Sequence, residues 1–497
     1  MAGMAGGEEE EMESLLQWAA TIGISDSPTA SSSASSCLGH SLSISTFPNN
    51  GGRGMAAARE LRRGEPVLRV PRAAILTTDS VVAADERIAS CVRKHSHLSS
   101  TKILTVCLLA EVGKGRSSGW YPYLVHLPRS YNTLANFTQS EIQALQVEDA
   151  IWVSEKAVQK SKSDWKMAIV LMQEMELKPQ LLTFKAWLWA SATLSSRTLH
   201  VPWDDAGCLC PIGDLFNYAA PEGETYSEDL ESPAESLQSN LFTSVKYNGS
   251  IEQFDSEQPE TYSLRLTDGG YEESTDSYCF YARERYRKGE QVLLSYGTYS
   301  NLELLEHYGF LLDVNPNDKA FLQLNTDIQT SSCWPKDSLY IQPDGCPSFS
   351  LLCSLRLWAT PLNLRRAVGH RAYSGSLLSA KNELFVMKWL ISHCQDSLRK
   401  LPTTIEDDEL LLDVIDKLLD HPSHKTCCEL LSPEGELSGF LKKNGLQKNE
   451  TGGCVLPTKA NRSLERWRLA VRWRISHKKT LRNCISYCKK QADKVSS

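Results

Sequence analysis

GEQVLLSYGTYSNLELLEHYGFLLDVNP, residues 289–316, is the stretch around which the rest of the chain is organised. Its apolar run Val292 to Leu294 predicts a short buried strand. Ser300, with Glu303 three positions later, has the spacing of a capping box and predicts the start of a helix. The helix should end at Tyr308-Gly309-Phe310, because a glycine readily closes a helix.

Two tyrosines, Tyr296 and Tyr308, and Phe310 therefore meet at one strand-to-helix junction. Gly297 can turn the chain tightly and leave the Tyr296 hydroxyl aimed into a cavity. Such a composition is typical of a functional site, and equally of a buried aromatic cluster around a turn. Only partner motifs elsewhere in the chain can separate the two interpretations.

The whole chain has the composition of a globular protein, with 497 residues and a net charge of -7. That length favours two or three domains. No apolar run reaches the roughly 18 residues of a membrane span, so we expect no membrane association. The N-terminus lacks the pattern of a secretion signal or a transit peptide, which favours the cytosol or nucleus. A serine-rich segment, 25–45, leaves a plastid route as an alternative.

The fifteen cysteines are scattered and form no paired CxxC sets. We therefore expect reduced, mostly buried thiols and no metal site.

Charge is distributed unevenly along the chain. Residues 221–276 contain fourteen Asp and Glu against two Lys and Arg, whereas residues 462–494 contain eleven Lys and Arg against two acids. A charge run is most often a solvated face. Binding of nucleic acid through the basic end is a further hypothesis, and such binding would weaken steeply with salt.

The remaining pattern predicts strands near the N-terminus and helices in two blocks. Residues 52–71 read as two short strands joined by a turn at Arg63-Gly64, and residues 262–281 as a hairpin about Asp268-Gly269-Gly270. Helices are expected at 13–22, 98–112, 138–146, 155–176 and 184–194. Beyond about residue 320 the helical spacing of Leu384, Met387, Ile391, Cys394 and Leu398, repeated at 410–419 and 464–475, predicts a helical second domain.

Four motifs taken together, GRGMAAARELRRGEPVLRVP, SSRTL, PIGDLFNY and GEQVLLSYGTYSNLELLEHYGF, resemble those of the SET-domain methyltransferases. The closer likeness is to the Rubisco large-subunit methyltransferase group. The resemblance implies an α+β fold: a β-rich SET domain at 49–318 with a helical insert at about 85–195 and an acidic insertion at about 221–262. It also implies an N-terminal helix and serine-rich linker at 1–48, and an all-α substrate-binding-like domain at 319–497.

The resemblance further implies S-adenosylmethionine as the methyl donor and assigns residues to its site. Tyr296 and Tyr308 match the catalytic tyrosines. The cofactor-binding positions are Gly52, Arg53, Gly54, Arg197, Asp214, Asn217, Tyr218, Tyr296 and Phe310. Gly51 stands where the family often has an acidic residue, and Tyr218 replaces the family's histidine.

The chemistry accounts for these residue types. Methyl transfer from a sulfonium to an amine is an in-line displacement, so the protein chiefly aligns the two reactants. An acceptor lysine must first lose its proton, which costs roughly 5 kcal/mol at pH 7 for a pKa near 10.4. Tyr296 fits as a hydroxyl that orients the acceptor better than as a strong base.

The sequence thus predicts a protein-lysine methyltransferase that acts on a non-histone protein held by the C-terminal domain, and that is a monomer. Histidine methylation is an alternative, as is a non-catalytic SET-fold binding module. The motifs do not identify the substrate or the number of methyl groups transferred.

Overall fold

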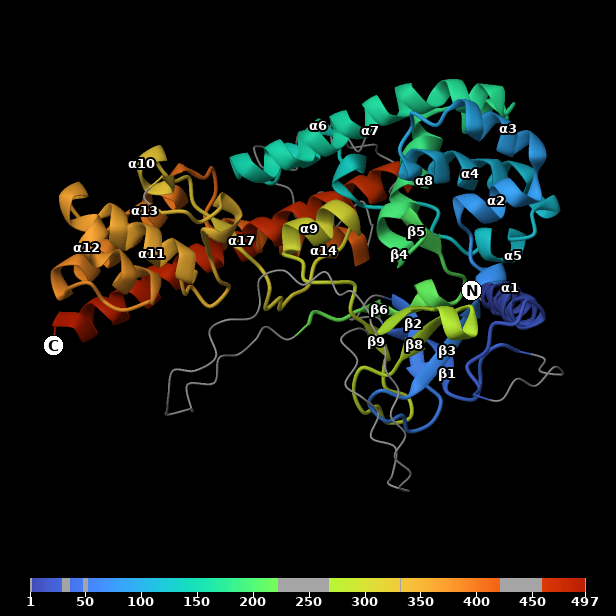
Figure 1. Cartoon of the computed structure of the whole chain (residues 1–497), viewed down its shortest axis with the longest axis horizontal. Coiled ribbons are helices and arrows are strands. Elements are labelled where there is room, and N and C mark those ends of the chain that lie inside the picture. The colour runs from blue at the N-terminus through green and yellow to red at the C-terminus, as the bar shows by residue number, and fades with distance from the viewer. Residues whose placement is uncertain are drawn as a thin grey trace, which may run out of the picture.

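The computed structural model describes residues 2–28, 36–47, 52–221, 268–330, 332–420 and 458–496. The acidic insertion expected at about 221–262 lies, beyond Pro221, outside the described residues. Figure 1 shows an α+β protein, as expected. Its first part combines small sheets with helices that cover them, and its C-terminal part is helical and extends away from the sheets. No helix of the described chain is long and apolar enough to cross a membrane.

The strands of the first part are short and form several small sheets. They are β1 (Leu42–Phe47), β2 (Gly52–Ala57), β3 (Pro66–Pro71), β4 (Thr198–Val201), β5 (Asp204–Leu209), β6 (Asn217–Tyr218), β7 (Gly269–Glu272), β8 (Ser277–Tyr281) and β9 (Leu293–Leu294). β1 pairs with β2, β4 pairs with β5, and β8 lies between β3 and β7, all antiparallel. β6 and β9 run parallel.

Two expectations about the strands need correction. The two strands expected in 52–71 exist, but they pair with β1 and β8 rather than with each other. Asp268-Gly269-Gly270 is not a turn, because both glycines belong to β7 and the chain reverses at 273–276. Asp276 takes the left-handed conformation there, at φ +44°, which aspartate tolerates better than most residues. The left-handed residue in this turn is therefore an aspartate and not one of the two glycines.

The expected N-terminal helix and inserted helices are present, several with shifted ends. They are α1 (Ala2–Thr21), α2 (Thr78–Ala84), α3 (Glu86–Lys94), α4 (Ser100–Lys114), α5 (Tyr121–Leu124), α6 (Gln139–Gln143), α7 (Glu148–Glu174) and α8 (Phe184–Arg197). α6 begins with the predicted capping box of Thr138 and Glu141. α4 is buried from Ile103 to Glu111 and packs against α7 and α8, which makes it the centre of this layer.

In its described residues the C-terminal part is helical apart from one small sheet of β10 (Ala320–Phe321) and β11 (Tyr340–Ile341). Its helices, with α9 before them, are α9 (Asn301–His307), α10 (Thr326–Gln329), α11 (Phe349–Trp358), α12 (Leu362–Tyr373), α13 (Ala380–Lys400), α14 (Ile405–Asp420) and α17 (Thr458–Ser496). The apolar positions predicted for the last helix, among them Leu464, Trp467 and Val471, are buried.

α17 ties the two parts together. Its 39 residues span about 58 Å at 1.5 Å per residue. It packs on α13 and α14, and also on α6 and α9. One apolar core accordingly joins Ile142 and Leu305 from the first part with Leu464 and Val471 from the last helix.

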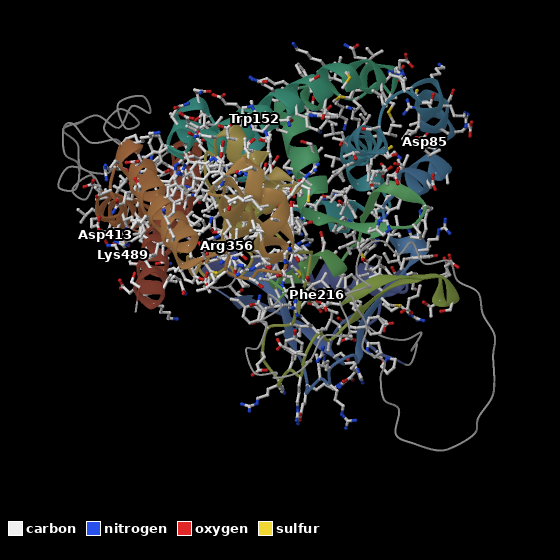
Figure 2. All side chains as sticks on the ribbon, turned by 60° about the vertical axis from the view of Figure 1, so that its left-hand side comes forward. Asp85, Trp152, Phe216, Arg356, Asp413 and Lys489 are labelled. Atoms are coloured by element: carbon white, nitrogen blue, oxygen red, sulfur yellow. The ribbon has the colours of Figure 1, made fainter. Side chains whose placement is uncertain are left out.

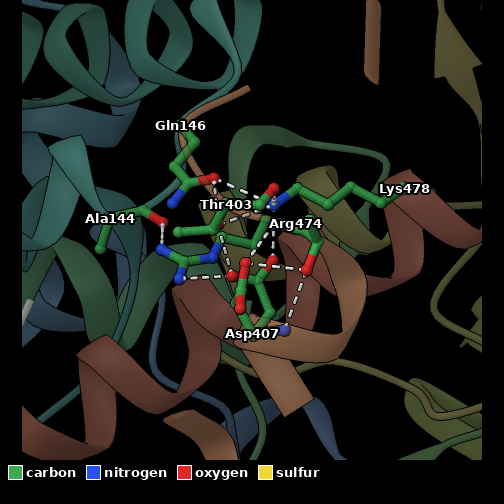
Figure 3. A network of polar contacts seen from close by, with 8 residues as sticks. Ala144, Gln146, Thr403, Asp407, Arg474 and Lys478 are labelled. Carbon is green, nitrogen blue, oxygen red and sulfur yellow. Dashed lines mark hydrogen bonds and ion pairs between the residues drawn. The ribbon is translucent and has the colours of Figure 1, made fainter. Parts of the chain in front are cut away.

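A buried ionic network reinforces this junction (Figure 3). Asp408 of α14 accepts from Arg474 at 2.7 Å and from Lys478 at 2.6 Å, and all three side chains are at most 1% exposed. Arg474 also donates to the carbonyl of Ala144 at 2.7 Å, and Lys478 to the side chain of Gln146 at 3.0 Å. The network therefore joins both C-terminal helices to the loop between α6 and α7.

Candidate active site

The predicted strand-to-helix junction forms as expected. β9 leads through a loop into α9, whose first turn is capped by Ser300 and Glu303 in a reciprocal pair. Gly297 in the loop has φ +127°, a conformation that only glycine adopts readily. Because β6 runs parallel to β9, Asn217 and Tyr218 lie beside this junction.

The glycine after α9 allows an unusually close backbone contact. Gly309 has φ +78°, and a Cβ there would stand 2.8 Å from the Asn132 carbonyl carbon and 2.9 Å from the Thr133 nitrogen. No side chain fits at that distance. The end of α9 therefore rests directly on the backbone of the loop before α6.

The structure brings four of the predicted site residues into one aromatic cluster. The rings of Tyr296 and Tyr308 are stacked with centroids 5.3 Å apart, and Tyr218 lies 5.3 Å from Tyr296. Phe310 lies 6.0 Å from both Tyr218 and Tyr308. Tyr299, which the sequence reasoning missed, joins the cluster at 5.5 Å from Tyr308.

The Tyr296 hydroxyl has a fixed direction. It donates a hydrogen bond to the carbonyl of Phe216, a residue that Figure 2 places between the strands and the helices above them. Burial raises the pKa of Tyr296 above its usual value, and burial likewise raises that of Tyr308. Both phenols therefore stay protonated at neutral pH, which suits hydroxyls that orient a partner rather than bases.

The side chains of Arg197 and Asp214 contact each other in the same region as the aromatic cluster. Arg197 donates to the Asp214 carboxylate at 2.9 Å and to its backbone carbonyl at 3.0 Å. Tyr123 donates to the same carboxylate at 2.8 Å. Tyr123 lies in α5 and belongs to none of the four sequence motifs. Only the tertiary structure shows that it buttresses Asp214.

These residues line a cavity of about 190 Å³. Arg197, Asp214, Phe216, Tyr296 and Tyr308 form its walls, together with His200, which no sequence motif singled out. The volume lies below the roughly 300–1,000 Å³ of pockets that enclose whole small molecules. It is suited to a single side chain that enters from outside.

Backbone strain marks the wall of this cavity. Ile212 is 1% exposed and has φ +68°, which is a genuine outlier for a β-branched residue. It precedes Gly213, where a Cβ would meet the Phe280 ring at 2.5 Å. Strain of this kind persists where the surroundings over-determine the backbone, and it is concentrated at functional sites.

On the other side of β6 the glycines of β2 make a narrow cradle. A Cβ on Gly54 would lie 2.5 Å from Nδ2 of Asn217 and 3.0 Å from Nε2 of Gln291. The Asn217 amide donates to the Arg53 carbonyl at 3.4 Å, and Gly52 has φ +76°. Gly52, Arg53 and Gly54 of β2 therefore lie together with Asn217.

Tyr218, which stands where the resembled family has histidine, is anchored. Its hydroxyl donates to the Gly297 carbonyl at 2.9 Å, and burial raises its pKa to about 12. The ring thus helps to hold the tight turn beside Tyr296.

Comparisons with known proteins agree with this architecture. A family model described as Rubisco LSMT substrate-binding matches residues 329–481. The protein SET DOMAIN GROUP 40 of Arabidopsis thaliana is 51% identical over 98% of this chain and 97% of its own length. The actin-histidine N-methyltransferase of Xenopus tropicalis is 23% identical, and the match covers 74% of this chain and 61% of that protein.

Solved structures give the same fold at low identity. The SET domain of LSMT bound to MeLysine and AdoHcy aligns with 98% of this chain and 93% of its own, at a TM-score of 0.56 and 18% identity. A structure of Rubisco LSMT bound to AdoMet aligns with a TM-score of 0.54 and 17% identity.

Proposed function

The chain belongs to the Rubisco large-subunit methyltransferase-like group of SET-domain proteins, and on that premise we propose that it is an S-adenosylmethionine-dependent protein-lysine N-methyltransferase acting on a non-histone protein. The observation that carries the proposal is the side-chain-sized cavity closed by Tyr296 and Tyr308 beside the glycine cradle. The helical part from about residue 319 would hold the protein substrate.

The cradle fits the amino-acid end of the cofactor. At Gly52 nothing lies within 4 Å of the place a Cβ would take, so a ligand has room to approach the backbone there. At Gly54 the missing Cβ lets the Asn217 amide lie against the backbone, where it supplies a hydrogen-bonding group. Gly52, Arg53, Gly54, Asn217 and Tyr218 would hold this end. Phe310 would pack on the adenine. When bound, S-adenosylmethionine supplies an electrophilic methyl group on a sulfonium.

The residues of the cavity would align the acceptor. Tyr296 keeps a hydroxyl at the junction, and the carbonyls of Arg197, Asp214 and Phe216 offer oxygen atoms around it. Such oxygens attract the polarised hydrogens of a methyl group weakly, each by about 0.5–1 kcal/mol. The neutral tyrosines and the buried walls favour an uncharged lysine amine, because burial disfavours its charged form.

Histidine methylation is the alternative, since several relatives are named actin-histidine N-methyltransferases. A neutral imidazole, with a pKa near 6.5, needs no costly deprotonation. A non-catalytic binding module is the remaining possibility, and Gly51 and Tyr218 are the departures that favour it.

Label transfer tests the proposal. The full-length protein is incubated with tritiated S-adenosylmethionine and a eukaryotic lysate, beside Tyr296→Phe and, as a matched control, Tyr340→Phe in β11. We expect labelled protein bands that weaken about 100-fold with Tyr296→Phe and persist with Tyr340→Phe, since a misplacement of the acceptor by about 1 Å can cost about 10²-fold in rate.

Mass spectrometry of the labelled bands then decides between lysine and histidine. Cofactor binding without label would favour the binding module. Absence of both label and cofactor binding would refute the methyltransferase proposal.

A further inference from the structure

A second, larger cavity lies between the inserted helices and the start of α17. Its volume is about 910 Å³. Its walls come from α4, the loop 129–136, the residues 180–183, the first half of α8 and the first turns of α17. We call this cavity the basic groove.

The lining of the basic groove contains five basic residues and no Asp or Glu: Arg129, Lys185, Lys459, Arg462 and Arg466. Arg466 is neutralised, because it pairs with the fully buried Glu141 at 2.8 Å. The other four form no ion pair with any residue of the described chain. Among the described residues the groove therefore has four positive charges without an acidic partner, although the chain as a whole is acidic at -7.

The floor of the basic groove is apolar and held in place. Leu109, Leu181, Leu188 and Trp189 contribute to it. The Trp189 indole donates to the Pro128 carbonyl at 2.8 Å, which fixes the ring against the loop that carries Arg129. A ligand for this surface should combine negative charge with apolar side chains, because burying the floor is favourable only against apolar groups.

The basic groove and the candidate active site are lined by different parts of the same helix. α8 lines the groove with Lys185 and Trp189, and lines the reaction cavity with Arg197 at its last residue. Tyr131 lines the groove, and its buried phenol lies against Arg197, whose charge partly offsets the rise in the pKa of Tyr131 caused by burial. The twelve residues from Lys185 to Arg197 correspond to about 18 Å along the helix.

We propose that the basic groove binds an acidic segment of the protein substrate. This inference rests on the proposed function, which places the methylated side chain in the reaction cavity. An extended peptide covers about 3.3 Å per residue, so the acidic segment lies about five to eight residues from the methylated side chain. The substrate class is therefore a protein whose target residue is followed or preceded, at that spacing, by Asp and Glu interspersed with apolar residues.

Nucleic acid is the competing occupant, because phosphates also seek uncompensated cations. The apolar floor, and a cavity of side-chain size lined by the other end of α8, favour a polypeptide. A binding experiment can distinguish a polypeptide from nucleic acid in the groove.

The test uses the full-length protein without cofactor and a fluorescein-labelled peptide of about twelve residues in which glutamates are interspersed with leucine and tryptophan. Fluorescence polarisation should show binding that weakens with salt, and a peptide with Gln in place of Glu should bind at least about tenfold more weakly. The quadruple variant Arg129→Glu, Lys185→Glu, Lys459→Glu and Arg462→Glu should also lose about tenfold or more.

A matched quadruple variant controls for net charge: Lys336→Glu, Arg366→Glu, Lys381→Glu and Lys388→Glu, all exposed in the C-terminal part. It should bind the peptide as the wild type does. Equal losses in both variants, or no binding by the wild type, would overturn the inference. A single-stranded oligonucleotide that binds more tightly than the peptide and is released by the groove variant alone would assign the groove to nucleic acid.

The result is separable from that of label transfer. Peptide binding is measured without chemistry, so it holds or fails whether or not the protein transfers methyl groups. If label transfer succeeds and the peptide does not bind, the groove inference alone is wrong. If the peptide binds and no label is transferred, the proposed function is wrong and the groove remains a site for acidic peptides.

Discussion

Two sets of basic residues on the same helix, α17, have opposite surroundings. Arg474 and Lys478, in its middle, are at most 1% exposed and share the carboxylate of Asp408. Lys459 and Arg462, near its start, line the basic groove without an acidic partner among the described residues. A buried charge is tolerated only when paired, whereas an exposed one can stay unpaired in water. The middle set therefore holds the protein together, and the first set is free to meet a partner.

The largest effect should come from removing the shared carboxylate. Asp408→Asn leaves two buried cations without their counter-charge and should lower the free energy of unfolding by about 3–5 kcal/mol. Chemical denaturation measures it. Glu409→Gln, one residue along α14, breaks the half-exposed pair with Lys479 and should cost less than about 1 kcal/mol. Similar losses in the two variants would contradict the distinction between buried and exposed pairs.

A smaller loss should follow from removing one of the two cations. Lys478→Met leaves Asp408 paired with Arg474, so the remaining buried pair is balanced in charge. The cost should be about 1–3 kcal/mol, because the oxygens of Gln146 and Thr403 lose a buried donor. The same denaturation series measures it, and a loss as large as that of Asp408→Asn would show that charge balance is not what matters there.

Substitution of basic residues in the groove should have the smallest effect on stability. The double variant Lys459→Gln and Arg462→Gln removes no ion pair with a described residue and should change the free energy of unfolding by about 0.5 kcal/mol or less. Peptide binding by the same variant should still weaken. A loss of more than about 1 kcal/mol in denaturation would show that these cations have a structural role.

The same contrast separates what sequence alone could predict from what it could not. The capping box of Ser300 and Glu303 is a local pattern, so it was predicted and is confirmed. The helical parts followed from periodicity, whereas the fold class was implied by the resemblance that the four motifs carry. The pairing of Asp408 with Arg474 joins residues far apart in the chain, and no local sequence pattern around either residue indicates it.

The candidate site shows the same limit. Tyr296, Tyr308, Asn217 and Phe310 could be named because they belong to recognisable motifs. The packing of α5 brings Tyr123 to Asp214, and the packing of β4 brings His200 to the cavity; no local pattern encodes either contact. The pairing partners of β2 and β3 were likewise beyond local reasoning, since turn residues show where strands end and not which strands meet.

The close contact at Gly309 has a mechanical consequence. The loop that carries Arg129 and Tyr131 in the groove continues to Asn132 and Thr133, on whose backbone Gly309 rests. No side chain separates the two backbones, so a displacement of the loop would also displace Gly309, the residue that follows Tyr308. A chain bound in the groove as proposed would therefore contact a loop whose backbone lies against the residue that follows Tyr308 in the lining of the reaction cavity.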